Sequence, residues 1–157
     1  MTERKPDFVA TIPWHDAKVS TLAIWCSDCR FQQQFDQFLR AGLGAEAFDK
    51  IAVPGGPQFL LDDDRPKFGW AGRRWLRFLV EHHEIKTVVC IGHEDCGWYK
   101  DLTGGALGRE ALNDAVKADL ARMPEAIRAD LPQVEVRPFF ASIARVPGPV
   151  VIFEAIA

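Results

Sequence analysis

The chain has 157 residues, of which 48% are hydrophobic and 26% charged, a composition that excludes a disordered protein. Its formal net charge of −3 provides neither the basic surface that nucleic acid requires nor a polybasic segment for anionic lipid. The sequence contains no apolar run of about 18 residues, so we expect no membrane-spanning helix. We expect one folded domain over residues 1–157, without nucleic-acid or membrane partners.

The amino-terminal segment mixes charged and apolar residues, so residues 1–8 show no secretory signal. The default expectation is a cytoplasmic protein, in which thiols stay reduced. The four cysteines are then better explained as metal ligands, catalytic groups or core residues than as disulfides. Residues 1–17 hold two prolines and little periodicity, and we expect them to form an arm on the surface or on a partner subunit.

Buried strands and amphipathic helices alternate along the rest of the chain. Short apolar runs predict strands at residues 19–25, 50–53, 86–92, 134–140 and 150–155. Apolar residues at helical spacing predict helices at residues 31–43, 68–83 and 110–129, the last with a break at Pro124. The helix at 68–83 is expected to turn Ala71, Trp75, Phe78, Leu79 and His82 to the core. Residues 58–67 are interpreted as a loop.

This alternation predicts an α/β fold with a parallel sheet and right-handed crossovers. Such sheets bind ligands beyond the carboxyl ends of their strands, where the strand order reverses. Three segments with chemically active or turn residues lie at these ends, at residues 26–30, 54–57 and 93–97. If the first and third strands are neighbours, residues 26–30 and 93–97 share one crevice.

Cys26, His93 and Cys96 form a metal-ligand pattern in that crevice. Thiolates and imidazole suit zinc, and three protein ligands leave a fourth position for water or substrate. The spacing between His93 and Cys96 lets both side chains reach one ion from a single turn. The alternative is that two inert buried thiols and a hydrogen-bonded core histidine occupy these positions.

Alternation along an extended segment places Asp28 and Arg30 on the same side as Cys26. Asp28 could therefore reach the fourth position of the metal, or be held away from it by a bidentate pair with Arg30. The alternative is an ordinary surface ion pair, worth roughly 0–1 kcal/mol.

The pattern Cys26-x-Asp28-x-Arg30, followed after an apolar strand by His93-x-x-Cys96-Gly97, resembles the signature of the β-class carbonic anhydrases. The resemblance implies a three-layer α/β/α fold with a mainly parallel sheet, strand order 2-1-3-4 and a C-terminal edge strand. It implies Zn²⁺ on Cys26, His93 and Cys96, and a homodimer or larger homo-oligomer. The implied activity is that of a lyase, the reversible hydration of CO₂ to bicarbonate by zinc-bound hydroxide. Asp28 would orient the hydroxide, and Arg30 would keep Asp28 off the metal.

Two features depart from the family pattern. Residues 1–25 lack the glutamine with which the family contacts substrate, and its Arg-Asn-Ala-Gly segment is replaced by residues 52–56. The candidates left to line a substrate pocket are Gly55, Gly56 and Gly97. Two further functions stay open, a non-catalytic zinc protein closed by Asp28 and the hydrolysis of a related substrate such as carbonyl sulfide.

A redox function is a third alternative. Trp25-Cys26-Ser27-Asp28-Cys29 reads as W-C-x-x-C at the end of a strand, which is typical of thioredoxin-like thiol–disulfide proteins. In those proteins the first thiol lies at a helix N-terminus, which lowers its pKa. This interpretation gives Cys29 a role, but it leaves His93 and Cys96 without one.

Overall fold

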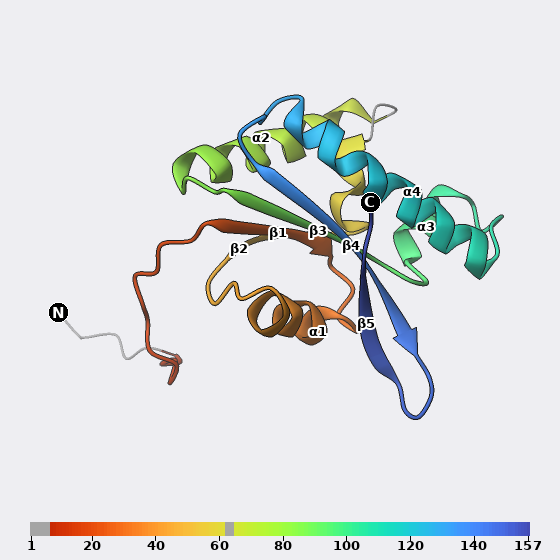
Figure 1. Ribbon diagram of the computed structural model, residues 1–157, viewed down its shortest axis with the longest axis horizontal. Helices are drawn as coiled ribbons and strands as arrows, with labels where there is room; N and C mark the ends of the chain where they lie inside the picture. Colours follow the sequence, from red (N-terminus) through yellow and green to blue (C-terminus); the bar gives the residue numbers. More distant parts are fainter. Residues whose placement is uncertain (1–6, 62–64) are drawn as a thin grey trace.

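The chain forms a five-stranded sheet in the order β2-β1-β3-β4-β5, seen in a computed structural model that describes residues 7–61 and 65–157 (Figure 1). The strands are β1 (Thr21–Cys26), β2 (Asp49–Val53), β3 (Thr87–His93), β4 (Glu135–Ala144) and β5 (Val150–Ala155). The first four pair in parallel, and β5 runs antiparallel to β4 at the edge. The predicted strand order and the C-terminal edge strand are confirmed.

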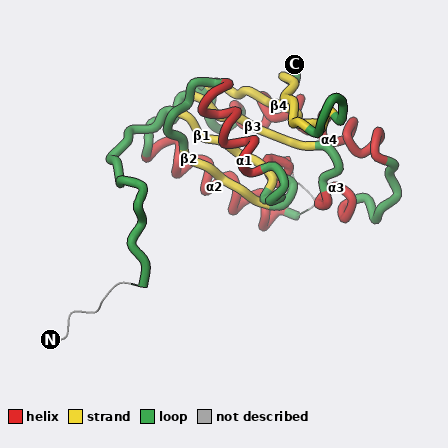
Figure 2. The backbone as a smooth tube through the Cα atoms, turned by 90° about the horizontal axis from the view of Figure 1, so that it is seen from below, coloured by secondary structure: helices red, strands yellow, loops and turns green. Residues whose placement is uncertain are grey.

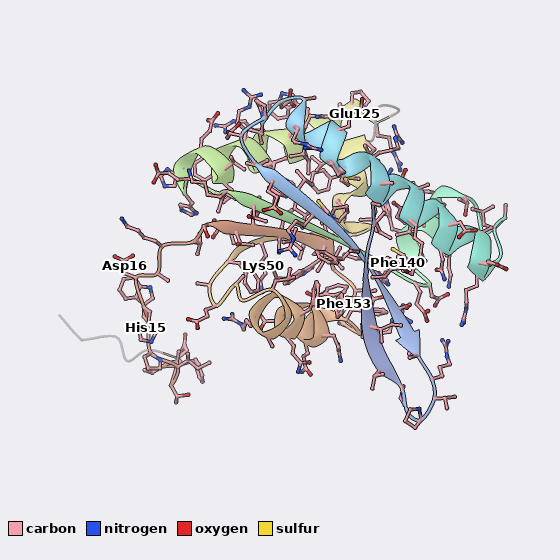
Figure 3. The ribbon with its side chains drawn as sticks, in the orientation of Figure 1. His15, Asp16, Lys50, Glu125, Phe140 and Phe153 are labelled. Atoms are coloured by element: carbon pink, nitrogen blue, oxygen red, sulfur yellow. The ribbon has the colours of Figure 1, made fainter. Side chains whose placement is uncertain are left out.

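Helices cover both faces of the sheet. They are α1 (Gln32–Gln37), α2 (Pro66–His82), α3 (Gly97–Leu102) and α4 (Arg109–Arg128), with a π-helical turn η1 (Phe38–Gly42) and a 3-10 helix η2 (Gly56–Leu61). Helix α1 lies on one face of the sheet, and α2 and α4 lie on the other (Figures 1 and 2). Phe153 of β5 stacks on Phe38 on the α1 side, whereas Phe140 of β4 packs into the core beneath α4 (Figure 3). The three-layer arrangement is thus the predicted one.

The two central strands are apolar because both of their faces are buried. Successive side chains of a strand point to opposite faces, so Leu22 and Ile24 of β1 pack towards α2 and α4 while Ala23 and Trp25 pack towards α1. The same alternation places Cys26, the last residue of β1, in the core on the α2 and α4 side.

Helix α2 turns a different face to the core from the one predicted. Its buried residues are Gly69, Gly72, Leu76 and Val80. Of the predicted core face, Trp75, Phe78 and His82 are exposed and Ala71 and Leu79 are half-buried. Close packing explains the difference, because a Cβ atom at Gly72 would lie only 1.9 Å from the ring of Phe59. Helix α2 therefore approaches η2 through its smallest residues and leaves its aromatic residues outside.

Three smaller expectations also need revision. The predicted loop at 58–67 begins as η2, which buries Phe59 and Leu60, and its residues 62–64 lie outside the described residues. Pro124 does not break α4, because the buried residues Leu120 and Ile127 hold the turns on both sides of it against the core. The arm has no helix or strand over residues 7–17, and residues 1–6 are not described. Within the described ranges, none of the helices combines the length and hydropathy needed to span a bilayer.

Candidate metal centre

The loops after β1 and β3 meet because these strands are parallel neighbours. Trp25 pairs with Ile91, so the residues that follow both strands emerge at the same edge of the sheet. Two backbone hydrogen bonds extend the ladders into the loops, from the Ser27 amide to the Val53 carbonyl at 3.0 Å and from the Glu94 amide to the Ala141 carbonyl at 2.9 Å. The crevice predicted at the carboxyl edge of the sheet is therefore held by backbone pairing on both sides.

Cys26, His93 and Cys96 converge in this crevice. One ligand atom from each lies within 4.8 Å of the other two, and all three residues are buried. The Sγ atoms of Cys26 and Cys96 are 3.9 Å apart. Two sulfurs that each lie about 2.3 Å from one ion at a tetrahedral angle would be separated by roughly 3.8 Å. The sulfur spacing therefore fits a shared zinc ion.

The imidazole of His93 has one nitrogen satisfied and one left over. Its Nδ1 hydrogen bonds the backbone carbonyl of Glu94 at 2.8 Å, so Nδ1 donates and Nε2 carries the lone pair. Nε2 is buried without a hydrogen-bond partner within the described part of the chain. The ring of Phe31 packs on the imidazole, with the ring centroids 4.5 Å apart. A buried acceptor without a partner is costly unless a cation binds it, so this nitrogen also fits a metal ligand.

The two thiols differ in acidity because they share one hydrogen bond. The hydrogen bond between the two sulfurs, together with His93, lowers the pKa of Cys26 to about 4 against the opposing effect of burial. The same interaction and burial raise the pKa of Cys96. Two sulfurs this close favour the loss of one proton from the pair, and a metal ion bound to both would displace the other.

Asp28 is held away from the cluster by Arg30. The guanidinium Nη2 lies 2.7 Å from Oδ2 of Asp28, and Nε lies 3.1 Å from each carboxylate oxygen. The backbone amide of Arg30 also donates to Oδ1 at 3.0 Å. The hydrogen bonds from Arg30 lower the pKa of Asp28, so the carboxylate is ionised at neutral pH. Of the two arrangements left open by the sequence, the structure contains the bidentate pair.

Asp95 links the two loops, a role that the sequence did not indicate. Its Oδ2 lies 3.8 Å from Nη1 of Arg30, an ion pair that joins the loop after β1 to the loop after β3. Its Oδ1 lies 2.6 Å from Nζ of Lys100 in α3. The backbone of Asp95 has a φ of 58°, and its amide donates to Oδ1 of Asn113. No local pattern signals these contacts, which depend on the arrangement of four separate segments.

Gln32 organises the loop that carries Cys26 and was also missed. Its amide nitrogen donates to the backbone carbonyls of Cys26 at 2.9 Å and Asp28 at 2.8 Å. Its carbonyl oxygen accepts a hydrogen bond from the indole of Trp25 at 3.1 Å. One side chain at the start of α1 therefore fixes the backbone at and just after the candidate ligand Cys26, together with the indole of the preceding residue.

The glycines predicted to line a pocket have different surroundings. Gly55 and Gly56 are buried and have φ values of 76° and 59°, whereas Gly97 at the start of α3 is exposed. A Cβ atom at Gly55 would lie 2.1 Å from the ring of Trp98, and the Trp98 indole donates to Oε1 of Gln58 at 3.0 Å. Gln58, a buried polar side chain of η2, lies within the stretch interpreted as a loop and was not singled out.

Replacing Gly56 with alanine is expected to destabilise the fold by about 2–4 kcal/mol. The residue has a left-handed backbone, and its Cβ atom would lie 2.9 Å from the backbone nitrogen of Cys26. The matched control is Gly97→Ala, where the added methyl group meets no other side chain or segment of the described residues within 4 Å and stability should change by less than about 1 kcal/mol. Urea unfolding followed by circular dichroism measures both, and equal stability of the two variants would contradict the expectation.

Cys29 does not join the cluster. It is exposed, whereas Cys26 is buried and faces Cys96. Helix α1 begins only at Gln32, so Cys26 does not lie at a helix N-terminus as the thioredoxin-like alternative requires. The observed contacts of Cys26 therefore favour a metal ligand over a redox thiol.

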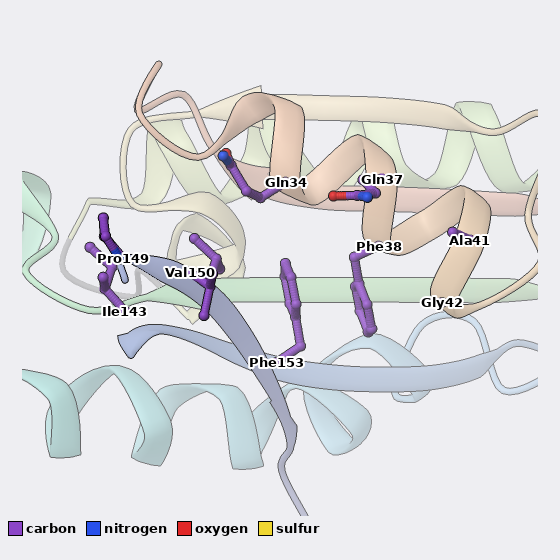
Figure 4. Close-up of a pocket in the computed structure, with 10 residues that line it drawn as sticks. Gln34, Gln37, Phe38, Ala41, Gly42, Ile143, Pro149, Val150 and Phe153 are labelled. Carbon is purple, nitrogen blue, oxygen red and sulfur yellow. The ribbon is translucent and has the colours of Figure 1, made fainter. Parts of the chain in front are cut away.

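A separate groove has a lining that shares no residue with the cluster. It has a volume of about 630 Å³ between α1 and the edge strand β5, with Phe38 and Phe153 on its wall (Figure 4). Its lining includes none of the three cluster residues and no charged side chain.

Solved structures of β-carbonic anhydrases share this fold. CafD of Aspergillus fumigatus matches with a TM-score of 0.53 and 16% identity, covering 84% of this chain and 89% of that one. CafA of the same fungus matches with a TM-score of 0.54 and 15% identity, over 89% of this chain and 77% of that one. The carbonic anhydrase of Streptococcus mutans gives a TM-score of 0.50 at 14% identity, over 89% and 82%. The fold is thus that of the β-class.

Sequence similarity defines the family. Residues 16–140, which include the whole cluster, match the family described as "Putative carbonic anhydrase", and the chain belongs to it. An uncharacterized protein of Rickettsia conorii is 32% identical over 133 residues, which cover 80% of this chain and 69% of that protein. An uncharacterized protein of Rickettsia bellii is 28% identical over 129 residues, covering 80% and 78%.

Proposed function

We propose that this chain is a zinc enzyme that reversibly hydrates CO₂ to bicarbonate, with Cys26, His93 and Cys96 as the metal ligands. The observation that carries the proposal is the buried cluster, with sulfurs 3.9 Å apart and an imidazole Nε2 that has no hydrogen-bond partner among the described residues. Membership of the carbonic anhydrase family supports the same reaction. A zinc ion with three protein ligands makes water a good nucleophile at neutral pH by lowering its pKa.

The protein's own residues would orient the reaction. Asp28, ionised and held by Arg30 two residues from Cys26, would accept a hydrogen bond from the attacking water and so direct its lone pair at the substrate carbon. Arg30 would keep the Asp28 carboxylate off the metal by holding it in the bidentate pair, and its contact with Asp95 would fix the guanidinium in turn. Asp28 is therefore the proposed catalytic residue and Arg30 a positioning residue.

The surroundings suit a small uncharged substrate. Gly55 and Gly56 bring the backbone close to Cys26 and to the indole of Trp98, and Gln58 holds that indole by its Nε1 hydrogen. We assign Gly55, Gly56 and Gly97 to the pocket, with Trp98 and Gln58 as its wall. A pocket bounded by glycine backbone and the Trp98 indole would suit CO₂, and it would also accept carbonyl sulfide.

Stopped-flow measurement of CO₂ hydration by the reduced, zinc-loaded protein between about pH 7 and 9 tests the function. We expect kcat/KM to exceed that of a Cys96→Ala variant by at least about 1,000-fold. If the protein turned over carbonyl sulfide but not CO₂, the proposed attack by metal-bound hydroxide would stand and the proposed substrate would be wrong. Turnover of neither substrate would leave a non-catalytic zinc protein and remove the enzyme assignment.

Following the family resemblance, we also propose that the chain forms a homodimer or larger homo-oligomer.

A further inference from the structure

We propose that Gln58 binds the reacting molecule beside the metal centre, with its side-chain amide nitrogen donating a hydrogen bond to an oxygen atom of bicarbonate. Bicarbonate is the product of hydration and the substrate of the reverse reaction. The inference rests on the proposed function and adds to it a residue that contacts the substrate. Its basis is a buried glutamine whose oxygen is engaged and whose nitrogen has no partner among the described residues.

The side chain of Gln58 is buried and its amide has a fixed orientation. Only 8% of the residue is exposed. Its Oε1 accepts a hydrogen bond from the indole Nε1 of Trp98 at 3.0 Å. An indole nitrogen can only donate, so this bond identifies the oxygen of the amide and turns the NH₂ group away from Trp98. The two hydrogens of that group therefore face another part of the surroundings.

Among the described residues, none accepts a hydrogen bond from Nε2 of Gln58. The buried polar and charged side chains of this part of the chain are Gln58, His93 and Glu94. His93 is a proposed metal ligand, and the carboxylate of Glu94 pairs with Arg145 at 3.2 Å. Within the same residues, His93 Nε2 is the side-chain atom that is both fully enclosed and without a partner, so Gln58 Nε2 keeps a path to solvent. Gln58 thus holds an unused donor that a small solute can reach.

Gln58 is tied to both loops that carry the proposed metal ligands. The 3-10 helix η2 begins at Gly56, where a Cβ atom would lie 2.9 Å from the backbone nitrogen of Cys26. Gln58 follows two residues later in the first turn of η2. Its hydrogen-bond partner Trp98 lies two residues after Cys96. The glutamine is therefore held next to the loop after β1 and the loop after β3, as a residue that binds substrate at this centre must be.

The indole that holds Gln58 is itself fixed in place. A Cβ atom at Gly55 would lie 2.1 Å from the ring of Trp98, so the ring packs directly on the glycine backbone. The guanidinium carbon of Arg65 lies 5.3 Å from the centroid of the same ring, within the range of a cation–π contact. A donor held by a fixed ring needs little reorganisation when it binds an oxygen atom, which is the property expected of a binding group.

A neutral amide donor suits this reaction. The oxygens of CO₂ gain negative charge as the oxygen of water adds to the carbon, and those of bicarbonate accept hydrogen bonds. The side-chain donors of Arg30 face Asp28 and Asp95, and the Asp28 carboxylate can only accept. Gln58 supplies a donor without adding a charge, so it stabilises the developing charge and still releases the anionic product.

Two substitutions separate substrate binding from a structural role of Gln58. Gln58→Glu keeps an acceptor for the Trp98 indole but has no amide hydrogens, whereas Gln58→Leu removes both groups at similar size. The controls are Gln37→Glu and Gln37→Leu, which make the same changes at an exposed residue of α1. Far-UV circular dichroism and zinc analysis verify that each variant is folded and loaded, and Gln58→Glu alone carries the test if the leucine variant does not fold.

Two measurements are made on the zinc-reconstituted proteins. Calorimetric titration with nitrate, a planar anion shaped like bicarbonate that cannot react, gives a dissociation constant without turnover. Stopped-flow dehydration gives the KM for bicarbonate. We expect both constants to rise at least about tenfold in the Gln58 variants, as for loss of a hydrogen bond to a charged acceptor, and less than about twofold in the Gln37 variants.

The outcomes separate this inference from the proposed function. If the wild-type protein hydrates CO₂ and both constants are the same in Gln58→Glu as in Gln37→Glu, the inference is overturned and the function stands. If the wild-type protein does not hydrate CO₂, the function is overturned and the nitrate titration alone decides the inference. Nitrate binding that is weakened in Gln58→Glu then upholds the binding role, whereas equal or absent nitrate binding overturns it.

Discussion

Replacing Cys96 with alanine is expected to weaken zinc binding by more than about 100-fold, because loss of even an outer partner of a ligand costs about 10–100-fold. Cys96 supplies one of three ligand atoms that lie within 4.8 Å of one another. Its removal would leave Cys26 and His93, too few ligands for a tightly held ion. Competition with a chromophoric chelator, combined with elemental analysis of the reduced protein, measures the change.

The matched control is Cys29→Ala. Cys29 lies in the same loop as Cys26, but it is exposed and does not belong to the cluster. This variant should hold zinc as tightly as the wild-type chain, under reducing conditions. If Cys96→Ala and Cys29→Ala bound zinc equally well, Cys96 would not be a ligand and the proposed centre would be wrong.

Replacing Asp28 with asparagine is expected to lower kcat/KM for CO₂ hydration by about 100- to 1,000-fold while zinc content stays unchanged. Asparagine keeps the size of the side chain but replaces the charged carboxylate that accepts two or more hydrogen bonds from Arg30 with a neutral amide. Its amide group also presents hydrogens where a carboxylate presents only acceptors. Stopped-flow hydration on protein of equal zinc content separates loss of orientation from loss of metal.

Asp36→Asn is the control for Asp28→Asn. Asp36 pairs with Arg40 at 2.7 Å, the same distance as between Asp28 and Arg30, but the pair lies on the exposed side of α1 and η1. Its loss should alter activity by less than about twofold, as expected of a surface ion pair worth about 0–1 kcal/mol. If Asp28→Asn changed the activity as little as Asp36→Asn, the pair between Asp28 and Arg30 would be an ordinary surface ion pair with no role in catalysis.

The sheet and the cluster could be predicted because local patterns determine both. Strands β1 and β3 are almost wholly apolar, so they had to be central, and Cys26 and His93 had to emerge where these strands end. The spacing of His93 and Cys96 then brought the third side chain to the same point. Whether Asp28 faced the cluster or Arg30 could not be decided from spacing, since both arrangements use the same residues.

The sequence could not predict which face of α2 packs on the core, nor which residues hold the loops of the candidate site in place. The helical pattern pointed to Trp75 and Phe78, whereas the packing is set by the room that Gly72 leaves for Phe59. The contacts of Gln32 and Asp95 depend on where several loops meet, and neither residue stands out in the sequence. Hydrophobic periodicity identifies a face that needs burial but does not say whether the same chain or a second copy buries it.

X-ray absorption at the zinc K edge of the purified, reduced protein tests the central claim most directly. The proposed centre predicts one zinc ion with two sulfurs at about 2.3 Å, one imidazole nitrogen at about 2.0–2.1 Å and one further light ligand, which persists in Asp28→Ala as water. A protein that retains no zinc after reconstitution, or a zinc shell without two sulfurs and an imidazole, would contradict it.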